Sequence, residues 1–159
     1  MKFPEKIYSV EDLKLARELV EKGFKHKIEI IGEESFVNRV KETFKLLETA
    51  GYMDFVRSYI RRIEEKGGFS QLRESELTIW ANKYTVSDLV EAASLWVQKA
   101  EQVRLFLNGI AHYSGDAEEA AIKKRIDFLK KLMRKTEDPK IKRKCREKLR
   151  MWFEGSLLY

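Results

Sequence analysis

Hydrophobic residues recur along most of the chain at the three- and four-residue spacing of an amphipathic helix. In the second half, for example, Leu89, Val90, Ala93 and Val97 keep this period. Prolines number only two and glycines eight, so residues that break helices are scarce. The pattern therefore predicts helices over six segments: 9–22, 34–49, 52–66, 87–107, 116–135 and 139–155.

Several of these segments carry start signals that are typical of helices. Ser9 and Asp12 have the spacing of a capping box, and Asp116 is followed three residues later by Glu119. Pro139 suits the first position of the last helix, because proline there loses no intrahelical hydrogen bond. These signals predict where the helices begin.

Two short segments have the pattern of β-strands. Residues 27–32 form a short run rich in the β-branched residue isoleucine. Leu77, Ile79 and Ala81 alternate with Thr78, Trp80 and Asn82. The predicted class is therefore α+β and predominantly α-helical, with about six helices and two or three short strands. Because the loops are short, residues 1–159 are expected to form a single domain.

Composition excludes several classes of protein. Hydrophobic residues make up 43% of the chain, which is typical of globular proteins. Cys145 is the only cysteine, which excludes a disulfide framework and a cysteine-based zinc finger. No apolar run approaches the roughly 18 residues of a membrane span, and no signal peptide is evident. Abundant Lys, Arg and Glu with few Gln and Asn favour a cytoplasmic protein of a thermophile.

Positive charge gathers near the C-terminus. Residues 121–150 hold 14 Lys and Arg against 4 Asp and Glu, a net of +10, whereas the whole chain is +6. The first interpretation is two solvated helix faces; the alternative is a nucleic-acid or polyanion surface. Phe128, Trp152 and Phe153 occupy apolar helical positions in or beside this tract, which favours the first. The residues of the nucleic-acid alternative are Lys123, Lys124, Arg125, Lys142, Arg143, Lys144 and Arg146.

Few side chains suggest catalysis. The sequence has no Gly-rich phosphate loop, no GxSxG, no CxxC and no HExxH motif. His26, between Lys25 and Lys27, is predicted to lie on the surface, and Cys145 to be half-buried. His112 precedes a predicted helix and is expected to order its loop by a hydrogen bond.

Glu91 is unusual because its predicted helix is apolar nearly all round. A carboxylate buried there is costly unless it is paired. We therefore predict that Glu91 faces the solvent edge or pairs with a Lys or Arg. The alternative is that Glu91 is the remnant of an active site.

Residues 28–63 (IEIIGEESFVNRVKETFKLLETAGYMDFVRSYIRRI) resemble the opening of small HExxH metallopeptidase-like (zincin-like) proteins. In that family a short strand, two helices and another strand precede the HExxH helix. Gly115, the pair Ala117-Glu118 and the pair Phe128-Leu129 resemble a downstream segment of the family. The resemblance implies a zincin-like core over 27–135 and a C-terminal helical extension over 136–159.

The resemblance places Glu91 at the general base and Glu118 at the third metal ligand. Val90 and Ser94, however, stand where the family has its two histidines. A zincin site needs two imidazoles at i and i+4 on one helix face, and without the zinc that they bind no water is activated. Arg125 also replaces a family glutamine. The resemblance therefore implies a vestigial cleft, without metal or cofactor, formed by Val90, Glu91, Ser94, His112 and Glu118.

Three functions follow, in order of preference. The first is a non-catalytic, degenerate zincin-like protein that serves as a binding or scaffold protein, with a protein partner or by self-association and without a membrane. The second is a nucleic-acid-binding module. The third is a divergent metal-dependent hydrolase that uses Glu91, His112 and Glu118, so the sequence favours a non-enzyme without deciding the matter. If the alignment is right, histidines introduced at positions 90 and 94 should rebuild a zinc site with Glu118.

Overall fold

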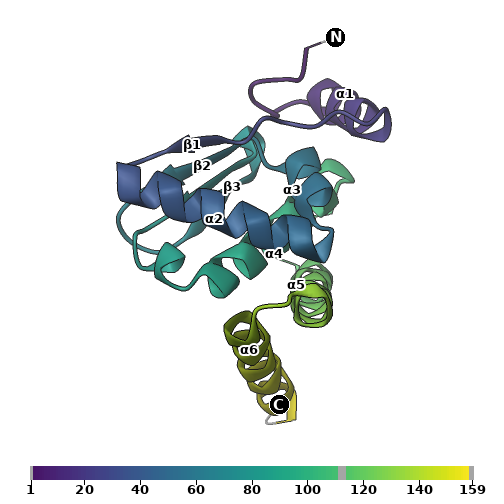
Figure 1. Cartoon of the computed structure of the whole chain (residues 1–159). Coiled ribbons are helices and arrows are strands. Elements are labelled where there is room, and N and C mark those ends of the chain that lie inside the picture. Colours follow the sequence, from purple (N-terminus) through teal and green to yellow (C-terminus); the bar gives the residue numbers. More distant parts are fainter. Residues whose placement is uncertain (1, 111–113, 158–159) are drawn as a thin grey trace.

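A computed structural model describes the backbone of residues 2–110 and 114–157, with side chains as far as Trp152 (Figure 1). The described residues form six α-helices and one four-stranded mixed sheet, which confirms the predominantly helical α+β class. The helices are α1 (Val10–Glu21), α2 (Glu34–Ala50), α3 (Met53–Tyr59), α4 (Leu89–Leu107), α5 (Gly115–Lys135) and α6 (Pro139–Leu157). The strands are β1 (Glu29–Ile31), β2 (Arg62–Glu65), β3 (Gln71–Arg73) and β4 (Thr78–Ala81).

The sheet has the strand order β1-β2-β4-β3, with β3 antiparallel at one edge and the other strands parallel. Ile63 and Ile79 stand opposite each other in the register and are fully buried, and Leu72 of β3 continues this row. Glu64 and Gln71, on the alternate positions, retain exposure. The sheet therefore buries one face and leaves the other towards solvent.

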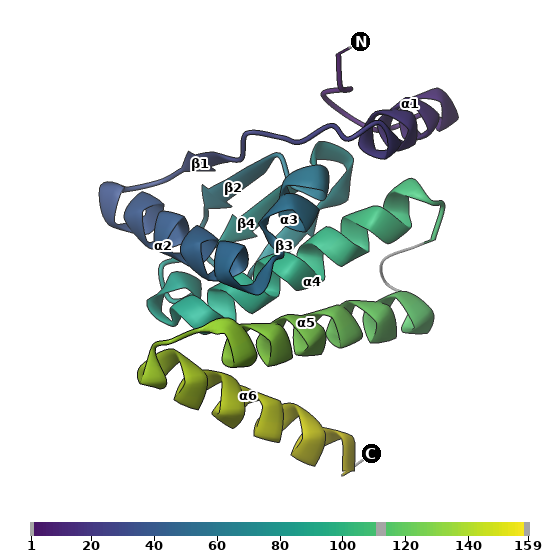
Figure 2. The same cartoon turned by 45° about the vertical axis from the view of Figure 1, so that its right-hand side comes forward.

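Helix α4 lies at the centre of the helical part. It packs against α2, where the indole N–H of Trp96 donates to Thr43 Oγ1 at 2.9 Å, both residues being fully buried. Helix α5 runs back along α4, and α6 covers the outer side of α5 (Figure 2). Within residues 139–152, the part of α6 whose side chains are described, Cys145 and Leu149 are buried. Within the described residues, no helix combines the length and apolarity that crossing a membrane requires.

The predicted helix over 52–66 is wrong in its second half, because α3 ends at Tyr59 and residues 62–65 form β2. Ile60 and Ile63 fit a helical period, but Ile63 pairs between two neighbouring strands instead. Strand β3 was not predicted either, since its pairing with β4 depends on residues distant along the chain. Four strands are therefore present where two or three were expected.

Side-chain caps mark where α1, α4 and α5 begin. The capping box of Ser9 and Asp12 is present, as predicted. Helix α4 begins after Asp88, whose side chain accepts from the Glu91 N–H, and residues 85–87 form a separate 3-10 turn. Helix α5 is capped by Ser114 rather than by Asp116, because the Ser114 hydroxyl accepts from the Ala117 N–H. The predicted starts of these two helices therefore shift by one or two residues.

Candidate functional site at the start of helix α4

Arg125 projects from α5 onto the first turns of α4 and is 7% exposed. Its Nε donates to Ser94 Oγ at 2.9 Å and its Nη1 to Gln98 Oε1 at 2.6 Å. Its Nη2 donates to the carboxylate of Glu91. Because residues 91, 94 and 98 are three and four apart, they share one face of α4. One buried cation therefore satisfies three polar side chains on that face.

Helix α6 supplies further charges to the same group. Lys148 Nζ lies 2.9 Å from Glu91 Oε2 and 2.8 Å from Asp88 Oδ2. Lys144 Nζ lies 3.5 Å from the same Asp88 oxygen. The Trp152 ring lies under the Arg125 guanidinium, with its centroid 5.3 Å from Cζ. We call these residues, together with those that Arg125 binds, the Arg125 network: Asp88, Glu91, Ser94, Gln98, Arg125, Lys144, Lys148 and Trp152.

The network favours the charged forms of Asp88 and Lys148. Burial acts to raise the pKa of Asp88, but hydrogen bonds from Lys148 and the Glu91 N–H outweigh burial and lower this pKa. Burial acts to lower the pKa of Lys148, but its bonds to Asp88 and Glu91 raise it. Both groups thus move away from the neutral range in which a general acid or base works best. The arrangement is suited to holding helices together.

The vestigial-cleft residues are only partly brought together. Val90 is 1% exposed within the core, and Ser94 is fully buried one turn further along the same helix. Glu91 pairs with Arg125 and Lys148, which confirms the predicted pairing with a cation.

Glu118 lies apart from this group. It is exposed and comes seven residues before Arg125 on α5, about 10 Å along the helix axis. His112 lies outside the described residues.

These positions do not fit a zinc ion. Val90 has no donor atom, and the Ser94 hydroxyl accepts from Arg125 and donates to the Glu91 carbonyl oxygen at 2.8 Å. In the described part of the chain, no group of three or more His, Cys, Asp or Glu side chains could hold a metal ion.

The cations of the basic tract, residues 121–150, differ in their contacts. Arg125 is buried in the network and Lys144 pairs with Asp88. Lys123 pairs with Glu119 at 3.2 Å, and Lys124 lies over the Phe55 ring.

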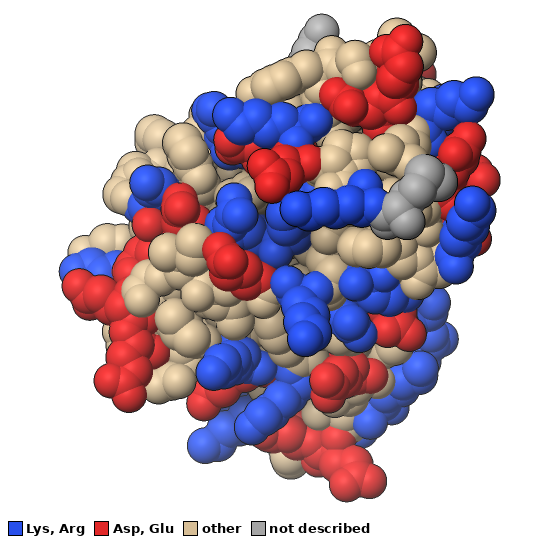
Figure 3. Space-filling view, turned by 90° about the horizontal axis from the view of Figure 1, so that it is seen from above, with Lys and Arg blue, Asp and Glu red and all other residues tan. Residues whose placement is uncertain are grey.

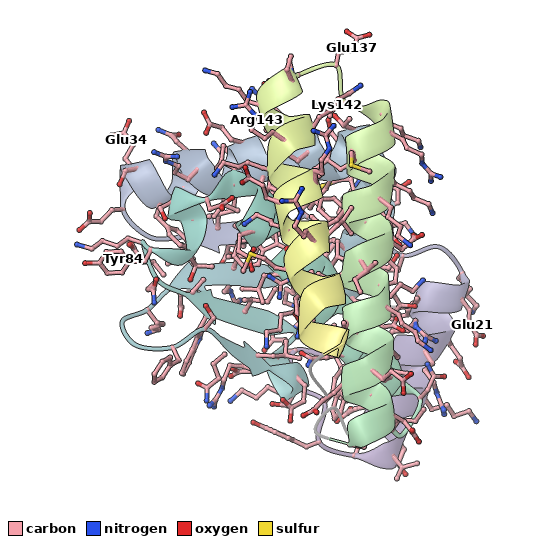
Figure 4. All side chains as sticks on the ribbon, turned by 90° about the horizontal axis from the view of Figure 1, so that it is seen from below. Glu21, Glu34, Tyr84, Glu137, Lys142 and Arg143 are labelled. Carbon is pink, nitrogen blue, oxygen red and sulfur yellow. The ribbon has the colours of Figure 1, made fainter. Side chains whose placement is uncertain are left out.

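The remaining cations of the nucleic-acid alternative lie on α6. Lys142 and Arg143 lie in its first turns (Figure 4), and Arg146 is exposed one turn further along. On the opposite side of the molecule, acidic and basic side chains are interspersed (Figure 3). Phe128 is fully buried and Trp152 half-buried, so both belong to the core as predicted, whereas the Phe153 side chain lies outside the described residues.

A cleft that the sequence did not indicate runs along β3. It has a volume of about 530 Å³ and is lined by residues 70–75 and by Lys99 of α4. Lys99 is partly buried, and burial together with the charge of Arg125 lowers its pKa. The cleft was missed because strand β3, which forms one wall, was not predicted.

Two further predictions concern buried side chains. His26 is 5% exposed, not on the surface, because the rings of Phe3 and Phe24 enclose it at centroid distances of 4.6 and 4.9 Å. Burial, with the charges of Arg61 and Arg57, lowers the pKa of His26 to about 4. Cys145 is fully buried rather than half-buried, and burial raises its pKa to about 11.

Comparison of the chain with protein-family models, with curated proteins and with solved structures found no match. The function is therefore inferred from the site.

Proposed function

We propose that the protein is a non-catalytic binding protein built on a degenerate zincin-like core. The observation that carries this proposal is the engagement of Glu91 and Ser94 by the buried guanidinium of Arg125. The resemblance assigns these two positions to a general base and a metal ligand. A fixed cation there opposes Zn²⁺ by charge repulsion and takes up the oxygen atoms that could bind it. The order of β1, α2 and α3, then further strands, then α4 is the order that the resemblance implies, whereas Glu118, its assigned third metal ligand, lies apart from Glu91.

The binding surface of this proposal is the cleft beside β3. Strand β3 is the last of the sheet order and pairs only with β4 among the described strands. An edge strand offers backbone N–H and C=O groups to an added strand. A cleft of about 530 Å³ along this edge leaves room for the side chains of an extended peptide segment.

Two cations, Arg73 and Lys99, and one carboxylate, Glu74, line the cleft, and this net charge of +1 favours an acidic residue in that segment. Lys99 contacts no carboxylate within 4 Å among the described residues, so its ammonium group can accept a partner's carboxylate. The guanidinium of Arg73 lies over the Trp80 ring, 4.6 Å from its centroid, and forms a long ion pair with Glu76, at 3.9 Å. The partner is therefore an extended, acidic segment of another protein or of a second copy of this chain.

Selection from a random library of short peptides tests this function. Selected peptides should contain Asp or Glu, should protect the amides of β3 from hydrogen exchange and should remain intact. The variant Lys99→Gln should bind them about tenfold more weakly, the effect of one charge-assisted hydrogen bond. Lys45→Gln, which changes an exposed lysine on α2, is the matched control and should bind normally. Peptides that bind Lys99→Gln as well as the parent, or that are cleaved, would contradict the proposal.

A second candidate function rests on the outer face of α6. Its exposed cations lie three or four residues apart and therefore share one stripe. Such a stripe can follow the phosphate backbone of a nucleic acid without reading its sequence. The residues of the stripe are Lys140, Arg143, Arg146 and Arg150.

The divergent hydrolase is the least supported candidate, because Glu118 lies away from Glu91. A cytoplasmic location in a heat-adapted organism remains part of the proposal on composition alone.

A further inference from the structure

A second cavity lies under the N-terminal segment. It has a volume of about 570 Å³, within the range of roughly 300–1,000 Å³ found for small-molecule sites. The N-terminal segment and α6 lie at opposite ends of the molecule (Figure 1), so this cavity is separate from the Arg125 network. The residues that line it are Lys2, Phe3, Glu5, Lys6, Phe24, His26, Arg61, Arg62 and Glu76.

Aromatic rings form the apolar part of the cavity. The centroids of Phe3 and Phe24 lie 5.1 Å apart, and His26 packs edge-on against both rings. Phe3 is 6% exposed, so these rings are fixed by the surrounding core. An apolar ligand body would find a rigid surface here.

The polar part of the cavity is positive. Four cations and two carboxylates line it, a net of +2. Arg61 donates to the carbonyl oxygens of Glu5, at 2.6 Å, and of Pro4, which are neutral acceptors. No carboxylate of the described residues lies within 4 Å of its guanidinium nitrogens, and Glu5 and Glu76 act on it only from a greater distance. A half-buried guanidinium without a contacting counter-ion is a ready site for an anion.

We propose that this cavity binds a small organic anion, whose apolar body packs on Phe3 and Phe24 and whose carboxylate or phosphate pairs with Arg61. This inference is independent of the peptide cleft beside β3.

Four probes separate the contributions of charge and ring. Benzoate and phenyl phosphate should bind and shift the NMR signals of the cavity residues. Benzyl alcohol, which has the ring without the charge, should bind at least about tenfold more weakly. Inorganic phosphate should bind more weakly than phenyl phosphate. Equal binding of benzyl alcohol and benzoate, or no shift with benzoate and phenyl phosphate, would overturn the proposal.

His26 reports the charge of the ligand independently of affinity. The positive charges of Arg57 and Arg61 help to lower its pKa, so an anion beside Arg61 should raise it. The NMR titration of the imidazole should therefore move to higher pH with phenyl phosphate, which stays anionic in the pH range where His26 titrates, and stay unchanged with benzyl alcohol. An unchanged titration in saturating phenyl phosphate would contradict the placement of the anion.

Two variants locate the site. Arg61→Gln should abolish benzoate binding, but Arg61 also holds the N-terminal segment. Lys6→Gln removes an exposed charge from the rim and should weaken binding about threefold. Lys45→Gln, exposed on α2, is the matched control. If both Arg61→Gln and Lys6→Gln bind benzoate with unchanged affinity, the proposal is overturned. Lys99→Gln should leave benzoate binding intact, which separates this site from the peptide cleft.

Discussion

Removal of the Glu91 carboxylate should destabilise the protein more than removal of the Arg125 guanidinium. The Arg125 side chain is 8% exposed, whereas the Glu91 side chain is 43% exposed. In Glu91→Ala the guanidinium stays buried with only Ser94 and Gln98 as acceptors. In Arg125→Met the carboxylate keeps Lys148 and has access to water. The two halves of one ion pair therefore carry unequal costs.

The magnitudes follow from this asymmetry. A buried charge that loses its partner costs about 3–5 kcal/mol, and the exposure of Glu91 places the cost of Glu91→Ala at the lower end, about 3 kcal/mol. Arg125→Met loses charge-assisted hydrogen bonds but fills much of the same volume, so we expect about 1.5 kcal/mol. The double variant should be less destabilised than the sum of the two, because no unpaired cation remains in it.

Urea denaturation at neutral pH measures these differences in the free energy of unfolding, provided that its slope against urea concentration is the same in all variants. Glu91 also lies in the first turn of α4, where a negative charge interacts favourably with the helix dipole. Glu34→Ala, an exposed acid in the first turn of α2, controls for this effect and should cost at most about 1 kcal/mol. If Arg125→Met is the more destabilising variant, or if the two substitutions are additive, the description of the network is wrong.

Three further predictions concern other parts of the molecule. Between pH 6.5 and about 4 the unfolded chain binds a proton at His26 and the folded chain does not. The free energy of unfolding should therefore fall by about 1.4 kcal/mol for each unit by which the pH is lowered in this range. His26→Phe should lack this pH dependence in thermal unfolding. Val90→His with Ser94→His, combined with Arg125→Gln to free position 94, should bind zinc more tightly than the parent by calorimetry; no gain in zinc affinity would contradict the zincin-like core. If α6 binds nucleic acid, band shifts should weaken steeply with salt and be independent of base sequence, and no shift at low salt would exclude this partner.

The helices were predictable because their signals are local. The apolar spacing in α2 and α4 and the capping box of Ser9 involve residues only a few positions apart. These signals can therefore be recognised in the sequence without knowledge of the fold. Strand β2 was mistaken for helix because Ile63 fits both periods, and only its neighbours in the sheet decide between them.

The site was predictable only in part. The cost of burying Glu91 indicated a cationic partner, but not that Arg125, distant in sequence, would supply it. For His26 a usable signal was present, since Phe24, His26 and Ile28 alternate with charged residues. The cavity around it was not predictable, because Phe3 and Arg61 meet His26 only in the folded chain.

Zinc content and peptidase activity, measured together on the purified native protein, test the central proposal most directly. The occupation of Ser94 and Glu91 by Arg125 predicts less than stoichiometric zinc by elemental analysis after mild dialysis. It also predicts no cleavage of a mixed peptide substrate, with or without added zinc. About one bound zinc per chain, together with cleavage that Glu91→Gln abolishes, would contradict the account and establish an enzyme.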